Sequence, residues 1–286
     1  MTAGARRDVP ARFRQQLLAA NLLRWCLVAA LVAGLFASFA AAGSTQGWII
    51  AGMAALVGIW MLLALRTLRQ VRTTRSSAAL LAQGRIEEAR RGLLLALNGL
   101  TPLRSVTILA CHYLAVAAHL SRSYREAIAL CRELLAHPLG SMKNLATATR
   151  LILADSLLML DEVDAASLVV QSIDGTKLSL ADRLTFLPIE LRYQLITDQA
   201  GQAVESLPEK VHLAELLDPW GAALTHALLA EACRRTNLIR QQDYLLRRAT
   251  LLADLEPIIA RYEPLLNSLA PHAGASGSPD SSDPDR

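Results

Sequence analysis

Two uncharged apolar stretches lie near the start of the chain, and a short polar turn joins them. The first runs from Trp25 to Gly43, the turn is Ser44-Thr45-Gln46, and the second runs from Gly47 to Leu65. At about 1.5 Å per residue, either stretch could cross a hydrocarbon core of about 30 Å as a helix. Two buried helices of a soluble domain are the alternative, but arginines flank both stretches. The pattern therefore predicts a transmembrane helical hairpin over residues 25–65.

The arginines also orient this hairpin. The polar segment 1–24 is rich in arginine, the turn between the spans has none, and arginine returns directly after the second span. Because arginine collects on the cytoplasmic side of membrane helices, both ends of the hairpin should be cytoplasmic. The arginines after the second span either contact anionic lipid or only fix the topology. They are Arg66, Arg69, Arg72 and Arg75.

Two targeting signals compete with this interpretation. Ala40-Ala41-Ala42 offers small residues for cleavage of a signal peptide, although a polar start of this length is long for one. Cleavage there would leave the second span and a cytoplasmic C-terminal part. The arginine-rich, acid-poor start also permits a mitochondrial address. We expect the cytoplasmic (inner) membrane of a bacterium.

Small residues recur at four-residue spacing on one face of each predicted span. Such faces let helix backbones approach closely in lipid. They serve either packing of the two spans within one hairpin or a seam between two copies of the chain. The residues are Ala30, Gly34, Ser38 and Ala42 on the first span, and Ala54 and Gly58 on the second.

From residue 66 onward the apolar positions change to amphipathic helical spacing. The segment 108–138 predicts two helices joined by Ser121-Arg122-Ser123, with Ala118 and Ala127 where the helices touch and Pro138 at the end. This segment resembles a tetratricopeptide repeat (TPR), a helix pair of about 34 residues with a small–small contact and a terminal proline. The resemblance implies a helical scaffold that binds other proteins.

The same small position recurs along the chain. The equivalent residues differ in number by 38, 39, 37 and 39, which predicts five helix pairs that stack as an α-solenoid over residues 66–270. A last helix over 256–270 would cap the stack, with a kink at Pro264. The segment 271–286 is rich in Gly, Ser, Pro and Asp, which predicts a disordered tail. The equivalent residues are Ala89, Ala127, Ala166, Ala203 and Gln242.

Composition supports an all-α protein at a membrane. Apolar residues make up 53% of the chain but aromatic residues only 5%, which favours helix over strand. The net charge of +4 conceals an excess of nine arginines over one aspartate in residues 1–75. Because this excess flanks the apolar stretches, it indicates membrane topology and not nucleic-acid binding. Cys26, Cys111, Cys131 and Cys233 form no C-x-x-C pair, and we expect free thiols inside helices.

The sequence offers no convincing catalytic or metal site. His112 and His119 lie seven residues apart on one predicted helix, but no third ligand has a spacing that completes a metal site. Asp161, Glu162 and Asp164 fall in a turn, where carboxylates are usually solvated. Motifs for nucleotide binding, zinc proteolysis and serine hydrolysis are missing from the sequence. We therefore expect neither catalysis nor a cofactor nor a bound metal.

The TPR resemblance places a partner-binding groove along the inner face of the first helices. The mixture of charged and apolar residues there suits an extended or helical peptide. A chaperone tail is not expected, because the positions that match the family's Lys/Asn clamp hold residues such as His112 and Val116. The candidate groove residues are His112, Val116, His119, Asp155, Leu158, Arg192, Leu195, Glu231, Arg234 and Arg235.

We thus predict a membrane-anchored scaffold with no catalysis of its own. The arrangement of two spans followed by helical repeats is also similar to that of HemY-like bacterial membrane proteins. That layout implies an alternative, an accessory or assembly subunit of an inner-membrane complex that binds mainly through its hairpin. A transporter component would need an ionisable residue within the membrane, and residues 25–65 contain none.

Overall fold

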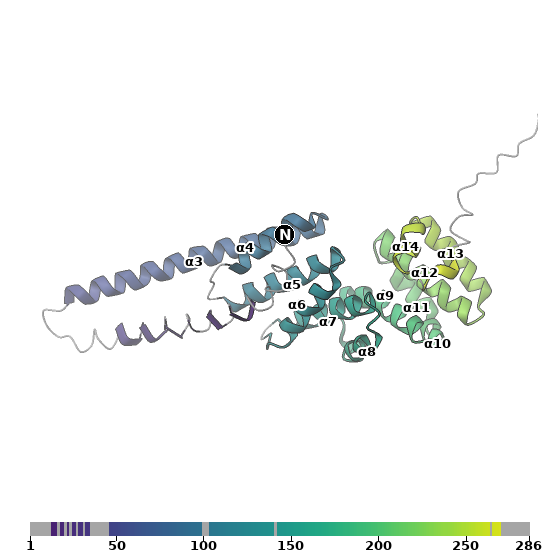
Figure 1. Ribbon diagram of the computed structural model, residues 1–286, viewed down its shortest axis with the longest axis horizontal. Helices are drawn as coiled ribbons and strands as arrows, with labels where there is room; N and C mark the ends of the chain where they lie inside the picture. Colours follow the sequence, from purple (N-terminus) through teal and green to yellow (C-terminus); the bar gives the residue numbers. More distant parts are fainter. Residues whose placement is uncertain are drawn as a thin grey trace, which may run out of the picture. The chain divides into compact units, whose positions relative to one another are not determined.

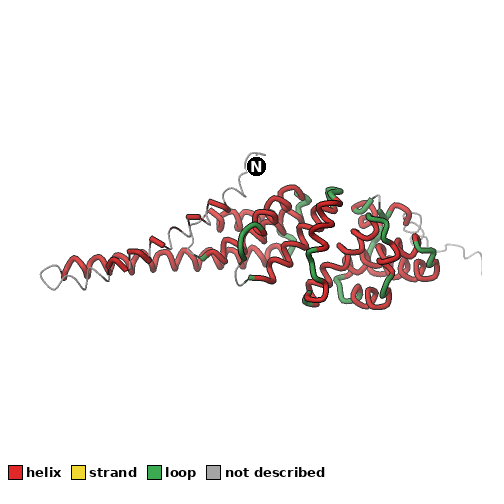
Figure 2. Tube along the Cα trace, turned by 90° about the horizontal axis from the view of Figure 1, so that it is seen from below, coloured by secondary structure: helices red, strands yellow, loops and turns green. Residues whose placement is uncertain are grey.

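A computed structural model describes residues 13–15, 18–19, 22, 25–26, 28–30, 32–34, 46–98, 103–139, 142–263 and 265–269. Every regular element in this part of the chain is a helix, as the tube in Figure 2 shows. The predicted all-α class is therefore confirmed. The chain divides into two compact units, Met1–Ser156 and Leu157–Arg286.

The first unit is built on one long helix. Helix α3 packs against α4 and α5, and α5 packs in turn against α6 (Figure 1). Helix α7 follows, and its last two residues already belong to the second unit. The elements are α3 (Gln46–Ala82), α4 (Ile86–Asn98), α5 (Arg104–Leu120), α6 (Tyr124–Leu135) and α7 (Lys143–Leu158).

The second unit is organised around α12, which packs against α9, α10, α11 and α13. Its core is rich in Leu and Ala, and Leu191, Leu228 and Ile258 are fully buried. The elements are α8 (Val163–Gln171), η1 (Gly175–Lys177), α9 (Leu180–Ile196), α10 (Ala200–Val204), α11 (Leu207–Ala214), α12 (Pro219–Arg235), α13 (Ile239–Leu252), α14 (Glu256–Arg261) and η2 (Asn267–Leu269).

The turns inside the helix pairs share one backbone geometry. In each turn one residue has a left-handed backbone, its N–H bonds to the carbonyl three residues back, and the next N–H bonds to the carbonyl five residues back. This is the Schellman arrangement that ends helices and reverses the chain. The left-handed residues are Gly84, Arg122, Asp161, Asp198 and Asn237, with φ of 76°, 58°, 60°, 58° and 59°.

These turns recur at the spacing that the small residues show. The left-handed residues differ in number by 38, 39, 37 and 39, as do the five predicted equivalent positions. Each equivalent position lies five residues after its turn residue. Ala89, Ala127, Ala166 and Ala203 are all fully buried, so a larger side chain has no room there. The described part of the chain thus repeats one helix–turn–helix unit five times.

Helix α3 runs without a break through the predicted end of the second span at Leu65. Its segment Ala54–Ala82 is, among the described residues, the one helix long and apolar enough to cross a membrane by length and composition. Apolar side chains on this segment are exposed, Trp60 by 65% and Met61 by 62%. The predicted first span, 25–43, lies largely outside the described residues.

The predicted capping helix over 256–270 is two short elements. Helix α14 begins next to Pro257 and ends at Arg261, and η2 follows at Asn267–Leu269. Pro264, the expected kink, is not among the described residues, and neither is the tail 271–286. Ile258, Leu266 and Leu269 are fully buried against the second unit, so this C-terminal segment covers part of its core.

Candidate partner-binding site

Several of the predicted groove residues of the second unit surround one cavity. Leu158, Arg192, Leu195 and Arg235 all line a space of about 460 Å³. The volume falls within the range of ordinary ligand pockets. The remaining lining residues are Met159, Asp161, Ile196, Arg261, Tyr262, Glu263 and Leu265.

Two well-capped helices supply the cavity's main side chains. The hydroxyl of Ser179 accepts a hydrogen bond from the backbone N–H of Asp182 and begins α9. The carboxylate of Asp218 likewise accepts from the N–H of Gly221 and begins α12. Such caps satisfy N–H groups that a helix start leaves without a partner. The start of each helix is therefore fixed by a local signal.

Arg192 lies at the centre of the lining. It is 4% exposed, and its guanidinium stands over the ring of Tyr262, 4.8 Å from the ring centroid. Its Nη2 is 3.2 Å from the Sδ of Met159. A buried guanidinium on an aromatic face is a favourable cation–π contact. Tyr262 belongs to the C-terminal segment, so that segment forms one wall of the cavity.

Glu231 is a buried acceptor beside the cavity. It is 1% exposed, and it accepts hydrogen bonds from Nε of Arg234, from Nε of Arg235 at 2.8 Å each, and from the hydroxyl of Ser268. Burial alone would raise the pKa of Glu231, but these hydrogen bonds outweigh burial and hold its pKa below the ordinary value. Arg235 also donates from Nη1 to the carbonyl of Leu195 at 2.7 Å. The carboxylate therefore ties α12 to the C-terminal segment, and Arg235, which it holds, ties α12 to α9.

The lining combines charge with apolar surface. Arg192, Arg235 and Arg261 contribute three positive charges, and Asp161 and Glu263 contribute two negative ones, which leaves one net positive charge. Leucine, isoleucine and methionine side chains supply the apolar part. Such a lining can hold an apolar side chain next to a carboxylate.

The predicted groove residues of the first unit form hydrogen bonds with α7. His112 is 6% exposed, and its Nδ1 is 3.0 Å from the hydroxyl of Thr149, which donates its own proton to the carbonyl of Leu145. The Thr149 oxygen must therefore accept from His112, which fixes the proton of the neutral ring on Nδ1. Burial lowers the pKa of His112 to about 4. Val116 is half-buried.

His119 is held from both sides of its ring. Nε2 is 3.0 Å from Oδ2 of Asp155, and Nδ1 is 2.9 Å from the hydroxyl of Ser156. The ring also meets Tyr124 edge-on, at 5.5 Å between centroids. His112 and His119, the two histidines considered as a possible metal pair, thus bond to separate partners on α7.

Most of the predicted membrane-packing and lipid-contact residues that the structure describes are exposed. Ala30, Ala54 and Gly58 are exposed and Gly34 is half-buried, whereas Ser38 and Ala42 lie outside the described residues. A Cβ added at Gly58 would meet nothing within 4 Å. The exposed guanidinium groups after the predicted second span form no ion pair within the described part of the chain. They belong to Arg66, Arg69, Arg72 and Arg75.

Sequence reasoning missed the C-terminal contribution to the cavity. The candidate groove residues were chosen from the first helix of each predicted repeat. Because Arg261, Tyr262 and Ser268 lie beyond the last repeat, that choice could not include them. The available signal was the apolar pattern of residues 256–269, which requires that this segment be buried against the helices before it.

Comparisons with known proteins found no family model, no curated protein and no solved structure that matches this chain.

Proposed function

We propose that this protein is a membrane-anchored scaffold that binds partner proteins through a TPR-like array of helix pairs. The observation that carries this proposal is the fivefold recurrence of one helix–turn–helix geometry at spacings of 38, 39, 37 and 39 residues. Repeats of this kind expose extended faces that bind peptides and helices. Catalysis is not part of the proposal.

The membrane anchor is supported by the surface of α3. Val57, Trp60, Met61 and Leu62 are each more than half exposed, and a contiguous apolar surface of this kind favours lipid or another helix over water. The proposed second span covers residues 47–65 and the first covers 25–43, with the repeats on the cytoplasmic side. The arginines after the second span would then lie at the level of lipid head groups.

A contact between Arg14 and Glu133 supports a hairpin rather than a single crossing. Both nitrogens, Nε and Nη2, lie 3.0 Å from the Glu133 carboxylate oxygens, and the neighbouring Phe13 is fully buried beside His137. Arg14 precedes both proposed spans and Glu133 follows them. Residues in direct contact must lie on the same side of a membrane, which an even number of crossings allows.

The alternative is an accessory or assembly subunit that binds its complex mainly through the hairpin, as the HemY-like layout implies. The observation in its favour is the open space at Gly58 on an exposed apolar helix. In this version the small-residue face packs against spans of other proteins.

One experiment separates the two versions. Partners are purified with the full-length protein from detergent-solubilised membranes, with Ile196→Glu in the cavity lining, Ile239→Glu as control and Gly58→Leu in α3. Ile239 is 65% exposed and lies outside the cavity, so its variant carries the same substitution elsewhere. Circular dichroism confirms that each variant is folded.

The groove version predicts that specific partners are lost with Ile196→Glu and kept with the other two variants. Loss with Gly58→Leu alone would favour the accessory-subunit version. Retention of every partner by all three variants would contradict both.

A further inference from the structure

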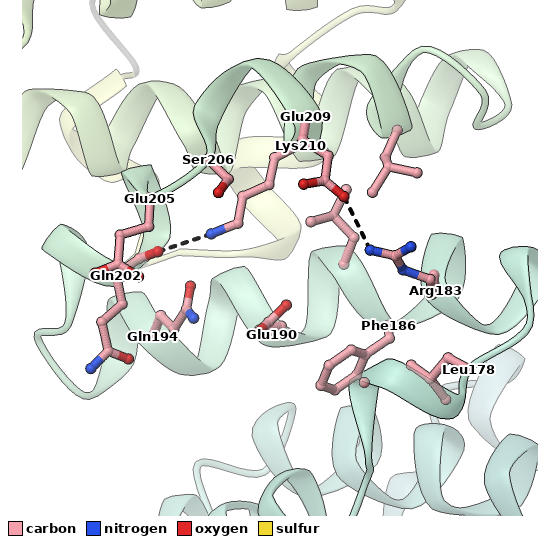
Figure 3. Close-up of a pocket in the computed structure, with 13 residues that line it drawn as sticks. Leu178, Arg183, Phe186, Glu190, Gln194, Gln202, Glu205, Ser206, Glu209 and Lys210 are labelled. Carbon is pink, nitrogen blue, oxygen red and sulfur yellow. Dashed lines mark hydrogen bonds and ion pairs between the residues drawn. The ribbon is translucent and has the colours of Figure 1, made fainter.

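A second cavity in the same unit lies apart from the predicted groove. It has a volume of about 540 Å³ and is lined by residues of α9, α10 and α11. Figure 3 shows its lining side chains. It exists because the second helix of this pair is split. Ser206 has a left-handed backbone, with φ 53° and ψ 35°, and a new helix, α11, begins at Leu207 with Pro208 in its first turn. The split leaves α10 only five residues long, so it cannot cover the face of α9.

Two acceptors on α9 point into this cavity. Gln194 is 7% exposed, and its Oε1 accepts no hydrogen bond from any described residue. Glu190, one helical turn earlier, is half-buried, and its carboxylate likewise receives no hydrogen bond within the described part of the chain. A buried acceptor without a donor costs free energy. A ligand that donates N–H groups would remove that cost.

The cations in the lining already have partners. Arg183 donates from Nη2 to the carboxylate of Glu209 at 3.1 Å. Lys210 donates from Nζ to the backbone carbonyls of Gln202 and Ala203 at 2.9 Å each (Figure 3). Lys210 attracts Glu190 electrostatically, but its hydrogen bonds, like that of Arg183, go to other acceptors and leave the Glu190 carboxylate and Gln194 Oε1 without a hydrogen bond from either cation.

The charge of the lining favours a cation. Glu190, Glu205 and Glu209 contribute three negative charges, and Arg183 and Lys210 contribute two positive ones, which leaves one net negative charge. Phe186 and three leucines supply the apolar part of the lining. A long side chain with an apolar stem and a cationic head matches such a lining. The leucines are Leu178, Leu187 and Leu213.

We propose that this cavity binds the guanidinium group of an arginine side chain presented by a partner polypeptide. The Glu190 carboxylate accepts two parallel N–H groups of the guanidinium, and Gln194 Oε1 accepts a further one. Residues four apart on a helix have Cβ atoms about 5–6 Å from each other, a span that one planar guanidinium can bridge. The compact ammonium of lysine presents its donors from a single atom and does not bridge it as well. This site does not depend on the function proposed for the groove.

The test measures binding of a blocked tripeptide, acetyl-Leu-Arg-Leu-amide, to the full-length protein in detergent. The matched peptides replace arginine by citrulline, which keeps the shape without the charge, or by lysine. The protein variants are Glu190→Gln, Gln194→Met and Glu256→Gln. Glu256 is exposed on α14 outside the cavity, so its variant controls for the change in net charge.

The arginine peptide should bind, and the citrulline and lysine peptides should bind about tenfold more weakly or worse. Glu190→Gln should weaken the arginine peptide by a similar factor, Gln194→Met by about threefold or more, and Glu256→Gln not at all. Gln194→Met removes a buried unpaired acceptor, so it should not destabilise the fold. Lost binding in that variant therefore cannot reflect unfolding.

Three outcomes would overturn the proposal. One is no binding of the arginine peptide up to about 1 mM, a concentration that detects even weak sites. The second is equal binding of the arginine and citrulline or lysine peptides. The third is unchanged binding to Glu190→Gln. None of these outcomes bears on the groove, which the partner purification tests separately.

Discussion

Acid should destabilise the first unit through His112. The ring is 6% exposed and its Nδ1 bonds to the hydroxyl of Thr149, so burial disfavours the charged form of the ring. Burial lowers the pKa of His112 from 6.5 to about 4. Between these two values the unfolded chain binds a proton that the folded chain does not. Stability is therefore fully present above 6.5 and decreases as the pH falls toward 4.

The size of this effect follows from the interval between the two pKa values. At about 1.4 kcal/mol per pH unit, the interval from 6.5 to about 4 amounts to about 3 kcal/mol. Small proteins unfold at a cost of about 5–15 kcal/mol in all, so one histidine would remove a large share.

The assay is urea denaturation of the full-length protein in detergent at several pH values across this interval. It compares the wild type with His112→Asn, whose amide can donate to Thr149 but does not titrate in this range. Hydrogen exchange of α5 amides locates the change in the first unit. His212→Asn is the control, because His212 is exposed. Equal pH dependence of the wild type and His112→Asn would refute the reasoning.

Three further substitutions test other features of the structure. Arg122→Gly should raise the free energy of unfolding by about 0.5–1 kcal/mol, because glycine tolerates a φ of 58°. The control Arg125→Gly, inside α6, should lower the free energy of unfolding by about 1 kcal/mol. Urea denaturation compares the two variants. Glu190→Gln should raise the melting temperature at neutral pH and not in acid. Burial raises the pKa of this carboxyl, so its contribution to stability falls as the pH rises through that pKa; an equal effect at both pH values would contradict this. Ser268→Ala removes a hydrogen bond to a buried carboxylate and should cost about 1 kcal/mol, with faster proteolysis of the C-terminal segment; Ser105→Ala, at an exposed position of α5, should change neither.

The repeat could be predicted from the sequence because its signal is local. A small residue is required where two helices touch, and a turn residue is required five positions earlier, so both recur with the period of the fold. The glycine at position 84 indicates a left-handed turn in the sequence, whereas Arg122 has the same left-handed backbone at a position where the residue type does not predict it. Pro208 also indicated an irregularity in the sequence: it makes the fourth repeat fit the pattern poorly, and the second helix of that repeat is split just before it.

The surroundings of the charged residues could not be predicted in the same way. Arg192 and Glu231 lie on helices among apolar residues, where charged side chains usually face water. Both are buried because residues far along the chain cover them, Tyr262 in one case and Ser268 in the other. Spacing along a single helix carries no information about such distant partners. For the same reason the unpaired acceptor of Gln194 is visible only in the structure.

The continuity of α3 has a mechanical consequence. The helix has 37 residues, which at about 1.5 Å each makes a rod about 55 Å long. One end carries the proposed span, and the other packs against α4 and α5 as the first helix of the repeats. No proline or glycine interrupts it between Leu65 and Ala82, so no hinge separates the anchor from the scaffold. Any tilt of the anchor that follows a change in bilayer thickness would therefore turn the first unit by the same angle.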